Sequence, residues 1–129
     1  MATGFPAITG DVLTSSMFNG LVAFTLNAQT GATYTAASTD QYQVLVTMDN
    51  AASNTFSIPT DASIAFPNGT AITVLQIGAG VTTIDAVTPG TTTITSAGAT
   101  PAAPVLARYK AAVAVKLGTN AWTIIGAVA

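Results

Sequence analysis

Short segments with the character of β-strands fill the chain from residue 32 onward, and turn residues separate them. The segments are rich in β-branched residues, and several alternate apolar with polar side chains, which is the period of a strand with one buried face. No helical pattern of about 10–15 residues lies between them. The sequence therefore predicts an all-β fold, a single β-sandwich or barrel-like domain of short antiparallel strands. Strands are expected at residues 34–36, 42–48, 55–59, 71–77, 81–85, 91–95, 105–109, 111–117 and 121–128.

Two glycine-containing segments carry clear turn signals. Gly118-Thr119-Asn120 separates two apolar segments and predicts a tight hairpin between the last two strands. Gly78-Ala79-Gly80 is also interpreted as a hairpin turn. A phosphate-binding loop is rejected there, because the further glycine and the Lys-Ser/Thr pair are absent and a strand follows instead of a helix.

The N-terminal segment, residues 1–31, is expected to form an arm, with the β-sandwich domain over residues 32–129. The arm is predicted to contain a helix of about two turns, capped by Asp11 or Thr14 and ended by Asn19-Gly20. A helix this short gains most of its stability by docking, so the arm is expected to be an attachment or inter-subunit element. The apolar residues expected to make this contact are Leu13, Met17, Phe18 and Leu21.

Charged residues make up only 6% of the 129 residues, against about one quarter in an average soluble domain. Three basic residues cannot follow a phosphate backbone, so nucleic acid is not expected as a partner. No apolar run reaches the roughly 18 residues of a membrane span. With a net charge of −2, mutual repulsion is too weak to keep an apolar face exposed, so burial in an oligomer is expected.

The residue types that perform most catalysis are scarce. The chain has no His, Cys or Glu, which removes Ser–His pairs, thiol catalysis and most zinc sites. The five Asp residues are scattered, and most adjoin expected turns or caps, where a carboxylate usually bonds neighbouring backbone. The sequence therefore predicts a protein that is not an enzyme and that binds no metal and no cofactor.

Three further features allow two interpretations each. The threonine-rich segment 91–95 is interpreted as a strand that faces solvent or a subunit; an ordered array of the ice-binding type would need a fixed repeat, which the sequence lacks. Arg108-Tyr109-Lys110 is interpreted as strand-edge charge that prevents wrong pairing, and the alternative is a grip on an acidic partner or a sugar phosphate. Trp122 and Ile124 share one face of a strand and are expected in the core or at a trimer axis. A sugar-stacking platform is the alternative for Trp122.

The order of six segments is also informative. They are Gly10-Asp11-Val12-Leu13-Thr14, Phe18-Asn19-Gly20-Leu21, Thr33-Tyr34-Thr35, and residues 63–70, 75–80 and 112–126. Together they resemble the small β-rich domain of virion surface proteins of tailed bacteriophages, of the capsid-decoration, head-fibre or tail-fibre type. Each segment alone is a generic strand and turn, so the resemblance depends on their order across most of the chain. Residues 88–104, rich in Thr, Ala and Pro, depart from it.

The resemblance implies a non-enzymatic structural protein on the capsid or tail surface of a bacteriophage virion, assembled as a homotrimer. A capsid decoration or cement protein or a head fibre is expected, in contact with other virion proteins such as the major capsid protein. The alternative is a tail-fibre tip or receptor-binding module that recognises a glycan on the bacterial surface. A loop cluster of aromatic and carboxamide residues would favour this alternative, and Gln41-Tyr42-Gln43 is the one weak example in the sequence.

Overall fold

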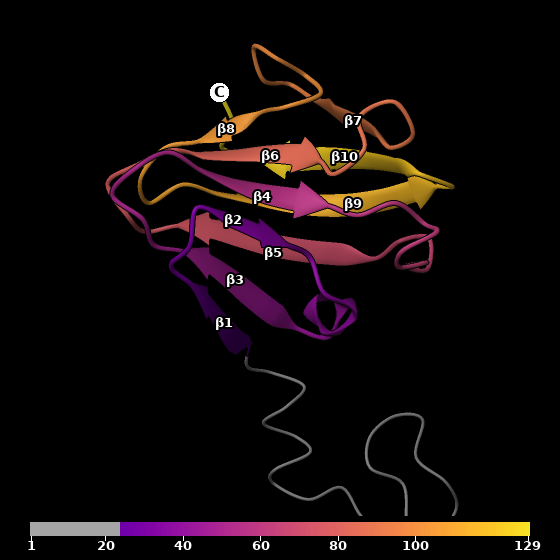
Figure 1. Cartoon of the computed structure of the whole chain (residues 1–129), viewed down its shortest axis with the longest axis horizontal. Helices are drawn as coiled ribbons and strands as arrows, with labels where there is room; N and C mark the ends of the chain where they lie inside the picture. Colours follow the sequence, from indigo (N-terminus) through magenta and orange to yellow (C-terminus); the bar gives the residue numbers. More distant parts are fainter. Residues whose placement is uncertain (1–23) are drawn as a thin grey trace, which may run out of the picture.

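Ten β-strands and one short 3-10 helix form the part of the chain that the computed structural model describes, residues 24–129. The protein is all-β, as the sequence predicts (Figure 1). No helix in this part is long and apolar enough to cross a bilayer. The elements are β1 (Thr25–Gln29), β2 (Thr33–Thr35), the 3-10 helix η1 (Ser38–Gln41), β3 (Val44–Met48), β4 (Asn54–Ile58), β5 (Ala71–Gln76), β6 (Thr82–Ala86), β7 (Thr93–Ser96), β8 (Val105–Leu106), β9 (Ala111–Gly118) and β10 (Ala121–Gly126).

The strands form two sheets, and the first six strands alternate between them (Figure 1). Sheet A has the order β1-β3-β5-β9-β10-β7, and sheet B has the order β2-β4-β6-β8. The strands β1, β3 and β5 pair in parallel in sheet A, and β2, β4 and β6 do so in sheet B. Three successive coils are therefore stacked: coil 1 (β1 and β2), coil 2 (β3 and β4) and coil 3 (β5 and β6).

The expectation of antiparallel strands is wrong for these coils. Their pairing is parallel because each connection leads to the other sheet instead of folding back beside the strand that has just ended. Antiparallel pairs occur where β9 joins β5 and β10, and where β8 joins β6. Short strands bounded by turn residues give the same sequence pattern in both arrangements, so the pattern alone could not separate them.

The coils differ in length, so their stacking leaves no fixed repeat in the sequence. Between coils 1 and 2, Thr25 pairs with Val44 in sheet A and Thr33 pairs with Thr55 in sheet B, so the spacing along the chain differs between the sheets. Between coils 2 and 3 the spacing is longer and is the same in both sheets. A search for a constant period therefore fails although the strands are stacked in register.

The corner after β5 lies directly on the corner after β3. A Cβ on Gly80 would overlap the carbonyl oxygen of Ala52, and a Cβ on Gly78 would overlap the backbone of Asn50. The buried Gln76 side chain stabilises the corner after β5. It accepts a hydrogen bond from Gly78 N–H at 3.0 Å and donates one to the carbonyl oxygen of Gly80 at 2.7 Å. The expected hairpin is therefore wrong here: β5 and β6 belong to different sheets, and the glycines allow two corners to approach closely.

The strands β9 and β10 form the predicted hairpin, which lies between β5 and β7 in sheet A. Asn120 in its turn has a φ of 48°, a left-handed conformation that Asn tolerates better than most residues. Beyond the hairpin, β7 pairs in parallel with β10. The hairpin thus widens sheet A beyond the three coils.

Buried side chains of both sheets form one hydrophobic cluster. Alternate residues of β5 and β9 belong to this core, while the residues between them are partly exposed on the other side of sheet A. The largest fully buried apolar side chains are Trp122, Phe56, Met48, Ile58, Ile72, Ile84 and Leu106.

The position of β1 changes the expected domain boundary. The sequence assigns Thr25–Gln29 to the N-terminal arm, yet this strand pairs with β3 and forms one edge of sheet A. The β-body therefore begins before residue 32. The remainder of the expected arm, residues 1–23, lies outside the described residues.

Candidate functional site

Three of the four described Asp side chains make structural contacts. Asp40, Asp61 and Asp85 each accept a hydrogen bond from a backbone N–H group close to them in space. Residues 24–129 contain no group of three His, Cys, Asp or Glu side chains that could hold a metal ion. The candidate site therefore lies on the surface rather than in a cluster of ionisable groups.

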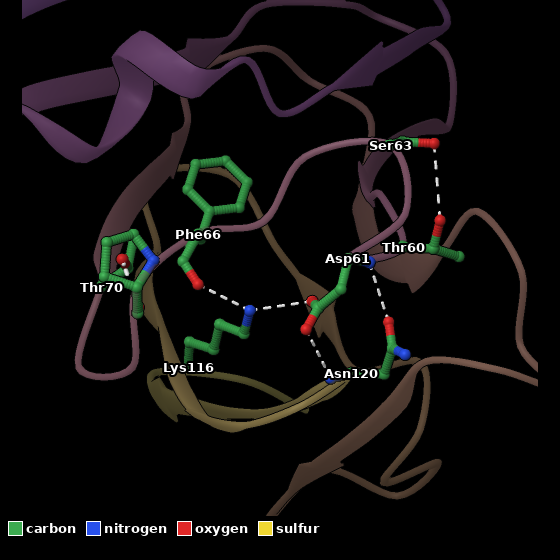
Figure 2. A network of polar contacts seen from close by, with 8 residues as sticks. Thr60, Asp61, Ser63, Phe66, Thr70, Lys116 and Asn120 are labelled. Carbon is green, nitrogen blue, oxygen red and sulfur yellow. Dashed lines mark hydrogen bonds and ion pairs between the residues drawn. The ribbon is translucent and has the colours of Figure 1, made fainter.

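A buried lysine joins the β4–β5 connection to the β9–β10 hairpin (Figure 2). The Lys116 side chain is 3% exposed, and its Nζ donates to Asp61 Oδ1 at 2.8 Å and to the carbonyl oxygen of Phe66 at 2.6 Å. Asp61 Oδ2 accepts from the backbone N–H of Asn120 at 3.2 Å. The hydrogen bond from Lys116, supported by that of Asn120, lowers the pKa of Asp61.

This network fixes the connection of residues 59–70 against sheet A. Gly69 N–H donates to the Lys116 carbonyl at 2.7 Å, and Lys116 N–H donates to the Thr70 carbonyl at 2.9 Å. Within the loop, the Thr70 hydroxyl donates to the carbonyl of Pro67 at 2.6 Å (Figure 2). The loop residues that follow Phe66 are thus held beside the outer side of β5 and β9.

A second polar cluster ties coil 1 to η1. Tyr34 donates its hydroxyl proton to Asp40 Oδ2 at 2.6 Å, and Asn27 Nδ2 donates to both Tyr34 Oη and Asp40 Oδ1, at 2.8 and 2.9 Å. Burial, followed by the hydrogen bond to Asp40, raises the pKa of Tyr34 to about 12. The phenol therefore stays protonated at neutral pH and remains a donor to the buried carboxylate.

Trp122 and Ile124 both lie in the hydrophobic core, 1% and 3% exposed. The ring of Phe66 meets Trp122 edge-on, with the ring centroids 5.6 Å apart. Trp122 Nε1 is one of two buried side-chain polar atoms in residues 24–129 without a hydrogen-bond partner. A tryptophan so enclosed offers no ring face on which a sugar could stack.

The outer face of sheet A carries no charged side chain. Lys116 is the only charged residue in the six strands, and its ammonium group is turned inward to Asp61. The strand register places the outward side chains in rows that cross the sheet. The central row is Leu26, Leu45, Thr73, Val113 and Ile125; the flanking rows are Ala28, Thr47, Leu75 and Ala111 on one side and Ala71, Val115, Thr123 and Thr95 on the other.

Two open depressions lie at this face. One, of about 580 Å³, lies over β5 and β9 and is bordered by the loop that the Lys116 network holds. The other, of about 520 Å³, lies where β10 meets β7. Lining residues of the first include Phe24, Gln41, Gln43, Asn68, Thr73 and Val113; those of the second include Thr95, Thr123, Ile125 and Val128.

The outer face of sheet B differs from that of sheet A because it is polar. Thr33, Thr55 and Thr83 form one row across the three coils, and Thr35, Ser57 and Asp85 form the next. The three threonines form an ordered row. If the coils had equal lengths, such a row would appear in the sequence as threonines at a constant spacing. The unequal coil lengths hide it, and the row does not involve the segment 91–95.

The remaining residues singled out in the sequence are placed as follows. Gln41 and Gln43 line the larger depression, and Tyr42 is 69% exposed beside it. Arg108-Tyr109-Lys110 lies in the connection between β8 and β9, where Arg108 Nε donates to the Ile77 carbonyl at 3.2 Å. The Arg108 guanidinium also lies 4.7 Å from the centre of the Tyr109 ring. Outside the described residues are Leu13, Met17, Phe18 and Leu21.

Sequence reasoning missed the outer face of sheet A. The signal that could have revealed it is the unbroken apolar run over residues 111–115 and the similar run at Val44-Leu45-Val46. A strand with apolar residues on both faces is covered on both sides in most folds. Such runs therefore indicate a second surface to be buried, besides the core.

Comparisons of the chain with protein-family models, with curated proteins and with solved structures give no match.

Proposed function

We propose that this chain is a non-enzymatic structural protein of a bacteriophage virion, a capsid decoration or cement protein or a head fibre that acts as a homotrimer. The observation that carries the proposal is the charge-free outer face of sheet A. A surface of apolar and threonine side chains has no group for acid–base chemistry but suits extensive contact with protein. The sequence resemblance supplies the virion as the setting.

The architecture is consistent with this function. Two sheets around one hydrophobic cluster fit a β-sandwich, and residues 1–23 lead into it at β1 as the proposed attachment arm. The Lys116–Asp61 and Asp40–Tyr34 clusters fix the connections between strands in place, and neither cluster forms an open binding site. The body is thereby a firm support for a contact surface.

The test is the number of copies per particle, measured by quantitative mass spectrometry on purified virions of the phage that encodes the chain. A decoration protein is present in hundreds of copies. A few to tens of copies would indicate a tail or a sparse fibre instead. Absence of the chain from the particle would contradict the proposal.

The second candidate is a receptor-binding module for a bacterial-surface glycan. The observation in its favour is that Gln41, Gln43 and Asn68 line one depression together with Phe24, which is 58% exposed. Carboxamides offer both donors and acceptors to sugar hydroxyls, and an aromatic ring offers a stacking face. Loss of host-cell binding in Asn68→Ala, with unchanged thermal stability, would favour this function over the structural one.

A further inference from the structure

We infer that the outer face of sheet A is the surface through which copies of this chain associate, each copy burying this face against the same face of its neighbours. The inference deepens the proposed function and rests on it only for the number of copies, three.

The distribution of charge selects a second copy as the occupant. Among the charged residues of the described chain, only Lys116 belongs to the six strands, and its ammonium group is turned inward to Asp61; the others lie in connections, in η1 or in sheet B. When the strands of this face meet those of a copy, they bring no like charges together, so the usual electrostatic penalty against self-contact is small. An anionic membrane or a nucleic acid would find no counter-charge on it. The charged residues are Asp40, Asp49, Asp61, Asp85, Arg108, Lys110 and Lys116.

The area of the face is sufficient. Six strands spaced about 4.8 Å apart, each about five residues long at about 3.3 Å per residue, cover roughly 500 Å² even as a flat plane. Three copies that bury it around a common axis remove roughly 1,500 Å² from water in the whole trimer, about the area of one standard protein–protein interface. A patch of this size lies at the upper end of what monomers leave exposed.

The shape of the face, with projecting side chains and hollows, also favours contact between copies. Leu26 and Ile125 are 68% and 61% exposed, and both belong to the central row. The two depressions lie at the same face and are bordered by Val113, Thr123 and Ile125. Projecting aliphatic side chains and hollows on one surface are what a self-complementary contact needs.

The outer face of sheet B provides the internal comparison. It is crossed by similar rows, but over the three coils these consist of hydroxyl groups and the Asp85 carboxylate, and only the first row ends in an apolar residue, Val105 of β8. Burial of these groups without partners would cost free energy, so this face is suited to remain in water. A lysine substitution on the outer face of sheet A should therefore prevent association between copies. The same substitution on the outer face of sheet B should leave association unchanged.

The test compares Val113→Lys with Thr55→Lys. Both positions point outward from inner strands of their sheets and are partly buried, Val113 on β9 and Thr55 on β4. Native mass spectrometry and sedimentation equilibrium at micromolar concentration should show trimers of the wild-type chain and of Thr55→Lys. Val113→Lys should be monomeric, with association weakened by at least ~100-fold, because three ammonium groups would be buried unpaired.

A circular dichroism melt of each variant checks that the monomer is folded. If Val113→Lys fails to fold, Ile125→Lys replaces it, since Ile125 is 61% exposed and lies on the same row. Val113→Lys or Ile125→Lys that is folded and still trimeric would overturn the inference, as would a wild-type chain that is monomeric. An assembly that depends on Val113 but is absent from virions would contradict the proposed function and leave the inference standing.

Discussion

At the scale of single residues, Trp122 carries the strongest prediction. It is 1% exposed and packs edge-on against Phe66, so Trp122→Ala should lower the free energy of unfolding by about 3–5 kcal/mol. Denaturant unfolding at fixed protein concentration measures this. Tyr42→Ala is the control, because Tyr42 is 69% exposed and its removal should change stability by no more than about 0.5 kcal/mol. Equal effects of the two substitutions would show that Trp122 is not in the core.

The Lys116–Asp61 pair gives a second prediction at this scale. Asp61→Ala leaves the buried Lys116 ammonium unpaired, which should cost about 3–5 kcal/mol. Asp49→Ala, at an exposed carboxylate, should stay within about 0.5 kcal/mol of the wild type. Urea unfolding of the three proteins at neutral pH provides the comparison.

The pH dependence of the same pair has a definite sign. The pKa of Asp61 is lowered in the folded chain, so the unfolded chain binds its proton first on acidification. The stabilisation is complete above the ordinary Asp pKa of about 3.8 that the unfolded chain has, and it is lost as the pH falls through the lower folded value. Wild-type stability should therefore drop more steeply below about pH 4 than that of Asp61→Ala. If the stability of the two proteins fell equally steeply with decreasing pH, the assigned Lys116–Asp61 pair would be contradicted.

At the scale of elements, the stacked corners depend on glycine. A Cβ at Gly80 would overlap the Ala52 carbonyl, so Gly80→Ala should destabilise the fold by about 1–3 kcal/mol. At Gly90 an added Cβ meets nothing within 4 Å, and Gly90→Ala should be neutral or stabilising by about 0.4–1 kcal/mol. Thermal melts of both variants test this. A Gly80→Ala variant as stable as Gly90→Ala would mean that the two corners do not stack as described.

The same elements show how far the sequence predicts the structure. The strand expected at residues 111–117 is β9, and the hairpin expected at Gly118-Thr119-Asn120 joins β9 to β10, because alternation and turn chemistry are local properties. Which strand pairs with which is not local. The sequence could therefore not reveal that the segment around Gly78 crosses between sheets, or that β1 belongs to sheet A.

The candidate site was harder to predict for the same reason. Lys116 and Asp61 are far apart in the sequence and meet only through the fold. Val113 and Leu45 become neighbours of Thr73 through strand register, which no sequence pattern encodes. The low charge predicted an associating surface, but the register was needed to show that one face of one sheet carries it.

At the scale of the whole molecule, the central claim is that the chain functions by contact between copies through a surface without charge. Sedimentation equilibrium of the wild-type chain at low and at high ionic strength tests this claim most directly. Because the outer face of sheet A offers no ion pairs to screen, the account predicts a trimer of the same affinity in both conditions. A monomer at micromolar concentration in both, or a trimer that dissociates as salt is added, would contradict it.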